Sequence, residues 1–292
     1  MKYTVLTLFP EITDAFFANS IMAKAVKKGI IEYQAINIRD FAADKHKTCD
    51  DAPYGGGPGM LMLPEPLARA LESLGAVKKE NKKLEVRDNN SKVADNITQC
   101  SQTTLSNPLN RVIYLSPSGK PFTQELAREL AKEKELILIC GRYEGIDQRI
   151  IDRYTDDEIS VGDFVLSSGE VAALAVIDAT YRLVDSVICP DSLCEESFSD
   201  GLLEYPQFTR PEVFDTIKVP EVLLSGHHEK IRLWRLEKRV EKTLRQRPDL
   251  IQRGRELGIF NSEIIGIIDR LTAPEQSGRY IQGEKDERNS GN

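Results

Sequence analysis

The stretch "LILICGRYEGID", residues 136–147, joins an apolar run to a turn that contains two glycines. Its apolar residues do not alternate with polar ones, which is typical of a strand covered on both faces. Two further stretches share this design of a strand leading into a glycine-containing turn: "YLSPSG" at 114–119 and "VGDFVLSSGE" at 161–170. Ligands of open α/β sheets bind where the strands end. The three turns together therefore predict one pocket, suited to a polar heterocycle and a ribose held by backbone hydrogen bonds.

Strand and helix patterns alternate along the first two thirds of the chain. The predicted strands are 2–9, 30–38, 111–116, 136–141 and 158–166. The predicted helices are 10–29, 63–75, 123–135 and 169–184, with a short one near 146–154. This alternation predicts an α/β fold on a mostly parallel sheet.

Helical patterns dominate the last third. A long amphipathic helix is predicted at 225–248, ended by Pro248, and shorter helices follow near 249–257 and 261–271. Thr209 in "TRPEVF" predicts the N-cap of one more helix. The predicted organisation is an α/β domain at 1–184 with a polar insertion at 77–110, a linker at 185–210, a helical domain at 211–272 and a disordered tail at 273–292.

The bulk composition is that of a soluble globular protein, with 40% hydrophobic and 29% charged residues among 292. No run of about 18 apolar residues is present, so we expect a cytoplasmic protein without a membrane partner. The five cysteines and three histidines show no zinc-ligand or disulfide spacing, so no metal site is predicted.

Charge at first argues against a nucleic-acid partner. The formal net charge is −7, whereas binding to phosphates needs Lys and Arg. Residues 229–256, however, hold ten Lys and Arg against five Asp and Glu. This local basic excess leaves an RNA partner open. Trp234 lies on the apolar face of the same helix and is predicted to be a core residue.

The stretch "DDAPYGGGPGML", residues 50–61, contains four glycines. It lacks the Lys-Ser/Thr that ends a phosphate-binding P-loop, and it lacks the G-x-G-x-x-G spacing of a dinucleotide site. Charged residues lie on its N-terminal side. The stretch therefore predicts a surface that a polar ligand backbone approaches closely.

The motifs "PYGGGPGM", "YLSP", "CGRYEGID", "GDFVLSSGE", "GLLEYPQFTRPEV" and "LSGHHEKIRLWR" follow one another in this order. In them the chain resembles the bacterial tRNA (guanine-N1)-methyltransferases, which belong to the trefoil-knot (SPOUT) methyltransferases. The resemblance covers about residues 1–250, apart from 77–110. It implies a knotted parallel-sheet domain, a homodimer with the active site at the subunit interface, and methylation of N1 of guanosine 37 in tRNA, next to the anticodon.

The resemblance also implies the methyl donor and its site. S-adenosylmethionine is expected to bind in a bent form within the three glycine turns. The implied cofactor-binding residues are Leu115, Ser116, Pro117, Gly141, Tyr143, Gly145, Val161, Gly162, Phe164, Leu166 and Gly169.

Methylation of guanine N1 requires a general base near that nitrogen and stabilisation of negative charge at O6. The resemblance assigns the base to Glu196 in "CEESF", where the family has Asp, and Glu195 stays as the alternative. It assigns Arg182 to the charge at O6. It also places Glu144 near the methionine moiety, where a carboxylate favours the cationic sulfonium. The implied RNA-binding residues are Asp50, Gly57, Gly59, Arg210, Arg232 and Arg235.

Three other readings stay open. The chain could be a knotted methyltransferase for another base or a ribose. It could be an RNA-binding protein without activity, since Glu196 and Ser168 depart from the family pattern. A nucleotide-phosphate binder built on residues 50–61 is disfavoured by the missing lysine.

Overall fold

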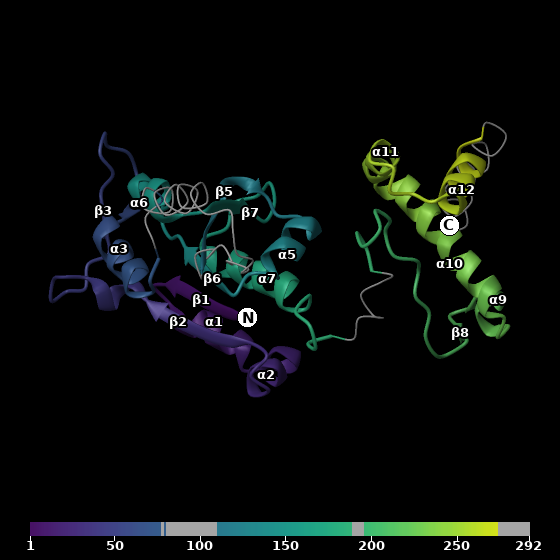
Figure 1. The fold of residues 1–292 in the computed structure, drawn as a ribbon, viewed down its shortest axis with the longest axis horizontal. Helices are drawn as coiled ribbons and strands as arrows, with labels where there is room; N and C mark the ends of the chain where they lie inside the picture. Colours follow the sequence, from purple (N-terminus) through teal and green to yellow (C-terminus); the bar gives the residue numbers. More distant parts are fainter. Residues whose placement is uncertain (77–78, 80–109, 189–195, 274–292) are drawn as a thin grey trace, which may run out of the picture. The chain divides into compact units, whose positions relative to one another are not determined.

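The chain divides into two compact units, Met1–Ile188 and Cys189–Asn292 (Figure 1). The computed structural model describes residues 1–76, 79, 110–188 and 196–273. The predicted insertion at 77–110 and the predicted tail at 273–292 lie almost entirely outside the described residues.

The first unit is built on a five-stranded sheet in the order β2-β1-β6-β5-β7, and every strand pair in it is parallel. The strands are β1 Lys2–Thr7, β2 Glu32–Asn37, β5 Arg111–Pro121, β6 Glu135–Cys140 and β7 Asp157–Ser160. The predicted parallel α/β class is confirmed. The trefoil knot stays a prediction.

Helices cover both faces of the sheet (Figure 1). On the central strand β6, Leu136, Leu138 and Cys140 pack into one apolar core, whereas Ile137 and Ile139 pack into the other. All five side chains are fully buried, which explains why none of these five positions is polar. The first core takes in α1 Pro10–Phe17, α2 Ser20–Lys27, α5 Gln124–Leu130 and α7 Gly169–Tyr181, and the second takes in η1 Ile38–Phe41, α3 Pro64–Ser73 and α6 Gln148–Tyr154.

The single helix predicted over 10–29 is wrong, because the chain forms α1 and α2 with a break at Asn19. Asn19 has an extended backbone, and its side-chain amide donates to the Ala15 carbonyl at 2.8 Å. A short polar side chain that bonds the backbone in this way competes with helix continuation. The apolar spacing runs through the break and so conceals it.

The strand predicted over 158–166 is too long, since β7 ends at Ser160. The Ser160 hydroxyl donates to the Gly162 carbonyl at 2.9 Å and turns the chain away from the sheet. Phe164, Val165 and Leu166 consequently lie in an exposed loop despite their apolar character. This loop borders the pocket described below.

The second unit contains α9 Glu221–Leu224, α10 His228–Gln246, α11 Pro248–Glu256 and α12 Ser262–Thr272. Its core includes Leu202 together with Val240 of α10 and Ile251 of α11. The Leu203 amide also donates to the Thr243 hydroxyl at 2.9 Å. Part of the range 185–210, predicted as a linker, thus belongs to the helical unit.

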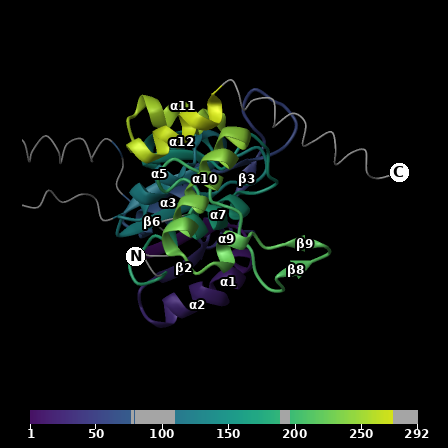
Figure 2. The same cartoon turned by 90° about the vertical axis from the view of Figure 1, so that its right-hand side faces the viewer.

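The helix predicted after Thr209 is wrong. The chain instead forms an antiparallel hairpin, β8 Val213–Phe214 and β9 Ile217–Lys218, which projects beyond α9 (Figure 2). The two residues between the strands, Asp215 and Thr216, have φ values of +46° and +68°. Two successive positive φ angles form the tight turn that two-residue hairpins require.

Candidate active site

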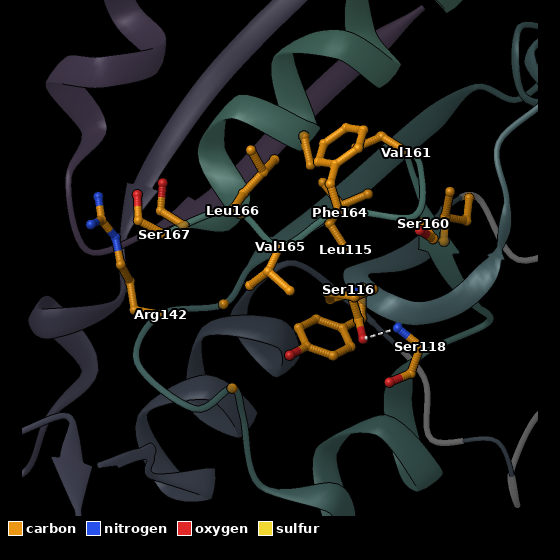
Figure 3. A pocket seen from close by; sticks show the side chains of 18 of the residues that line it. Leu115, Ser116, Ser118, Arg142, Ser160, Val161, Phe164, Val165, Leu166 and Ser167 are labelled. Atoms are coloured by element: carbon orange, nitrogen blue, oxygen red, sulfur yellow. Dashed lines mark hydrogen bonds between the residues drawn. The ribbon is translucent and has the colours of Figure 1, made fainter. Parts of the chain in front are cut away.

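A cavity of about 320 Å³ lies where the three glycine turns meet (Figure 3). Its walls come from the bulge that interrupts β5 after Leu115, from the turn after β6 and from the loop after β7. Arg142 and Ser167 lie at one edge of the pocket, and Ser160 lies at the opposite edge (Figure 3). The size falls within the range typical of small-molecule sites.

Two glycines allow these turns to approach one another. The Gly169 amide donates to the Gly141 carbonyl at 2.9 Å, and a Cβ on Gly169 would lie 2.7 Å from the Cys140 Cα. A Cβ on Gly119 would lie 2.4 Å from the Ile159 backbone nitrogen. No side chain fits at either position, so the close backbone contacts that shape the pocket require glycine.

All eleven residues predicted to bind the cofactor line this one pocket, and Glu144 lines it with them. Ser168 and Ala172 line it as well. Seven further lining residues were not predicted, and they lie within or next to the same three segments: Tyr114, Ser118, Arg142, Ile159, Ser160, Val165 and Ser167. Their position next to the glycine turns was the available signal, but side-chain direction could not be read from spacing.

The two charged side chains among the described lining residues are Arg142 and Glu144. Arg142 stacks over the Phe9 ring at 4.4 Å, and its Nε lies 3.4 Å from Oε2 of Glu170. Glu170 is fully buried and accepts a hydrogen bond from the Thr7 hydroxyl at 2.5 Å. A buried carboxylate requires such partners, so this network fixes Arg142 at the edge of the pocket.

Burial controls the ionisation of Tyr114, which lines the pocket, and of Cys140, which precedes the lining residue Gly141. It raises the pKa of the Tyr114 hydroxyl, against a smaller opposing effect of a backbone hydrogen bond with Ile146. It also raises the pKa of the Cys140 thiol well above its ordinary value. Both groups are therefore neutral near pH 7, and neither is a nucleophile or base in the resting site.

The loop between β3 Asp50–Asp51 and β4 Leu61–Met62 forms a rim beside this pocket. The Glu144 amide donates to the Met60 carbonyl at 3.0 Å, and the Met62 amide donates to the Gly145 carbonyl at 3.0 Å. A Cβ on Gly59 would lie 2.5 Å from the Glu144 side chain. Gly57 and Gly59, predicted to bind RNA, thus lie in a loop attached to the pocket wall, and Asp50 lies on the strand that leads into it.

The other two predicted catalytic residues do not line the pocket. Arg182 caps the C-terminus of α7, whereas Gly169 at the N-terminus of that helix lines the pocket. Glu196 is half-buried in the second unit, on a loop where the Phe198 amide donates to the Leu202 carbonyl at 2.9 Å. The alternative base, Glu195, lies outside the described residues.

Six basic residues of the helical unit form ion pairs with acidic neighbours. Arg232, predicted to bind RNA, contacts Glu229 at 2.8 Å and Glu263 at 2.6 Å. Arg235 stacks over the Tyr205 ring at 4.7 Å, and Arg210 is exposed. Further ion pairs are Lys238–Glu241, Arg239–Asp200, Arg247–Asp249, Arg255–Asp269 and Arg270–Glu237.

Trp234, predicted as a core residue, is half-buried and lies 6.3 Å from the Phe208 ring, outside the apolar core cluster of the helical unit. Within the described ranges, no helix is long and apolar enough to cross a bilayer. In the same ranges, no three His, Cys, Asp or Glu side chains are grouped to hold a metal ion.

The sequence pattern of the family described as tRNA (Guanine-1)-methyltransferase TrmD matches residues 1–253. Two curated relatives carry the name tRNA (guanine-N(1)-)-methyltransferase and come from Treponema. The one from Treponema denticola is 58% identical over 263 residues, covering 90% of this chain and 96% of the relative. The one from Treponema pallidum is 52% identical over 271 residues, covering 93% and 96%.

A relative with the same name from Borrelia duttonii is 56% identical over 252 residues, covering 86% of this chain and 92% of the relative. These matches span both the glycine-turn pocket and most of the helical unit. The chain belongs to the tRNA (guanine-N1)-methyltransferase family.

Proposed function

We propose that this protein is a cytoplasmic enzyme that transfers a methyl group from S-adenosylmethionine to N1 of guanosine 37 in tRNA. The observation that carries the proposal is the convergence of the eleven expected donor-binding residues on one pocket. Family membership supports the same substrate class. A trefoil knot through the three turns is part of the proposal.

The pocket suits a nucleoside that carries an amino-acid chain. Its wall combines apolar side chains, among them Leu115, Val161 and Phe164, with the backbone of three glycine-containing turns. Apolar surface and backbone groups together suit a flat heterocycle and a ribose. Glu144 adds a carboxylate that favours a cationic ligand. When bound, S-adenosylmethionine supplies a methyl carbon made electrophilic by its sulfonium.

The residues of the chain have three tasks in this reaction. Glu196 removes the N1 proton, which leaves the nitrogen lone pair free to attack. Arg182 stabilises the negative charge that develops on O6. The glycine turns hold the reacting groups in line, so that an encounter between two substrates becomes a step within one complex.

The position of Arg182 supports a homodimer. Arg182 follows the 13-residue helix α7, which begins at Gly169 in the pocket, and at 1.5 Å per residue this corresponds to about 20 Å. An arginine that far away cannot serve the pocket of its own chain. We propose that Arg182 acts in the pocket of a second copy, so that each active site is completed by the partner subunit.

Mixing two inactive variants tests this arrangement. Arg182→Ala and Glu144→Ala should each be nearly inactive alone. Subunit exchange between them should restore roughly a quarter of the wild-type rate, because half of the dimers are hybrids with one intact site. Methyl transfer is measured before and after exchange, with each variant mixed with itself as the control. A mixture that stays inactive would place both residues in the same subunit's site.

The loop at 50–61 is proposed to admit the anticodon loop, with Asp50, Gly57 and Gly59 at the RNA and Arg210, Arg232 and Arg235 at the tRNA body. Gly57 has φ of +125°, and a Cβ there would meet no described atom within 4 Å. Its substitution therefore strains the loop without touching the pocket.

Gly57→Val is expected to raise the tRNA KM about tenfold and to leave the affinity for S-adenosylhomocysteine within twofold. Steady-state kinetics with tRNA and calorimetry with S-adenosylhomocysteine measure the two effects separately. Gly59→Ala is the comparison, because its Cβ lies against Glu144 and should affect both measurements. Loss of nucleoside binding in Gly57→Val would contradict this division.

The test of the proposed function is methyl transfer from labelled S-adenosylmethionine to tRNA transcripts with guanosine or adenosine at position 37. Transfer is expected with guanosine alone, and digestion of the product should yield 1-methylguanosine. Equal transfer to both transcripts would overturn the position. Donor binding without transfer would favour an RNA-binding protein that lacks activity.

A further inference from the structure

Tyr54 stands at the tip of the loop between β3 and β4, and its relative exposure is 102%, so its ring is entirely in solvent. Single exposed apolar side chains are common and need no explanation by themselves. This ring differs in its setting, because the loop that carries it is fixed to the wall of the proposed active site.

The loop is held at its base and open at its tip. Backbone hydrogen bonds of 3.0 Å join Met60 to Glu144 and Met62 to Gly145, and Met62 pairs with Ile146 as a parallel bridge. At the tip, Gly55 and Gly56 have φ values of +88° and +75°. A Cβ on either glycine would meet no described atom within 4 Å, so among the described residues the space beside Tyr54 is open to an incoming molecule.

The tip lies within reach of the nucleotides next to the target. Tyr54 lies five positions before Gly59, which abuts Glu144 at the pocket, and five fully extended residues span at most about 18 Å. Bases adjacent to one bound at the pocket fall within this radius.

The surroundings of the ring also suit a nucleic acid. Arg149 at the start of α6 forms a two-point ion pair with Asp147, with N–O distances of 2.9 and 2.7 Å. Asp147 is the main cause of a raised pKa of Arg149, and the Tyr54 hydroxyl adds a smaller effect through space. The ion pair thus fixes this guanidinium on α6, and the backbone next to the Tyr54 ring carries no side chains at Gly55 and Gly56.

We propose that Tyr54 is a stacking platform for an unpaired base next to the guanosine that is methylated. The proposal rests on the proposed function and adds to it a residue that selects a splayed, single-stranded substrate. Specific recognition of RNA commonly targets unstacked bases and stacks them on aromatic side chains. Stacking tolerates any base, because every base has a π-face.

Three variants separate stacking from simple contact. Tyr54→Ala and Tyr54→Leu should each raise the tRNA dissociation constant about tenfold, since Leu keeps the apolar surface but lacks the ring. Tyr54→Phe should stay within twofold of the wild type. S-adenosylhomocysteine affinity, measured by calorimetry, should be unchanged in all three. Equal tRNA affinity of Tyr54→Leu and Tyr54→Phe would overturn the stacking role.

A second experiment removes the partner base. Transcripts with an abasic nucleotide on the 5′ or the 3′ side of the target are bound by wild type and by Tyr54→Ala. On one side of the target, the loss of tRNA affinity caused by the abasic nucleotide and the loss caused by Tyr54→Ala should not be additive, because each change removes the same contact. Additive losses at both flanks would overturn the proposal.

The remaining outcomes are also decisive. If Tyr54→Ala changes the sedimentation of the protein, the ring contacts a second copy and the proposal is wrong. If the wild type neither binds nor methylates tRNA, the proposed function itself fails. Normal tRNA binding by both wild type and Tyr54→Ala contradicts the stacking role alone.

Discussion

Glu196→Gln is expected to lower kcat for methyl transfer by about 10²–10⁴-fold, because a positioned general base contributes that much to a proton transfer. Gln has the shape of Glu but cannot accept the N1 proton at neutral pH. The loop that carries Glu196 is well anchored: the Glu204 amide donates to the Ser197 hydroxyl at 3.0 Å, and Asp200 pairs with the buried Arg239. The substitution should therefore leave folding intact.

Single-turnover methyl transfer at saturating tRNA and donor measures this loss, while thermal unfolding and tRNA binding should match the wild type. Glu195→Gln is the matched control and should stay within about threefold, since its carboxylate is not the assigned base. A large loss in Glu195→Gln with normal turnover in Glu196→Gln would move the base to its neighbour. Equal losses in both would mean that the two carboxylates act together.

The sheet could be predicted because short stretches of the sequence reflect how its strands are buried and connected. The unbroken apolar run of β6 reflects burial on both faces, and the alternation with helices reflects the connections of a parallel sheet. Two of the failures occurred where one polar side chain overrides the apolar pattern. Asn19 breaks a helix, and the Ser160 hydroxyl ends β7 ahead of three apolar loop residues. Hydrophobic periodicity does not report such single hydrogen bonds.

Part of the candidate site could likewise be predicted from the sequence, and part of it could not. The glycine turns could be recognised because residues without side chains mark close backbone contacts, and the eleven residues expected there do meet in one pocket. The network of Arg142, Glu170 and Thr7 could not be predicted. It joins residues 163 positions apart, and Glu170 reads in sequence as an ordinary acidic residue in the first turn of a helix. Only tertiary packing brings it to the buried side.

Gly169→Ala is expected to raise the dissociation constant for S-adenosylhomocysteine at least about 100-fold, which corresponds to about 2.7 kcal/mol. The added methyl would lie 2.7 Å from the Cys140 Cα and 2.8 Å from the Gly141 nitrogen, both of them backbone atoms. Backbone atoms cannot rotate away from the added methyl group as a side chain can. The start of α7 must therefore move away from the end of β6. Overpacking of this kind also costs about 1–3 kcal/mol of the free energy of unfolding.

Gly266→Ala is the matched control for this change. Gly266 lies on the exposed side of α12, and a Cβ there would meet no described atom within 4 Å. The same methyl should stabilise the protein by about 0.5–1 kcal/mol and leave binding unchanged. Calorimetric titration measures the binding affinity of both variants, and chemical denaturation measures their free energy of unfolding. Because both variants add the same methyl group, any difference between them comes from the position of that group. Wild-type affinity in Gly169→Ala would mean that the contact between β6 and α7 does not set the width of the pocket.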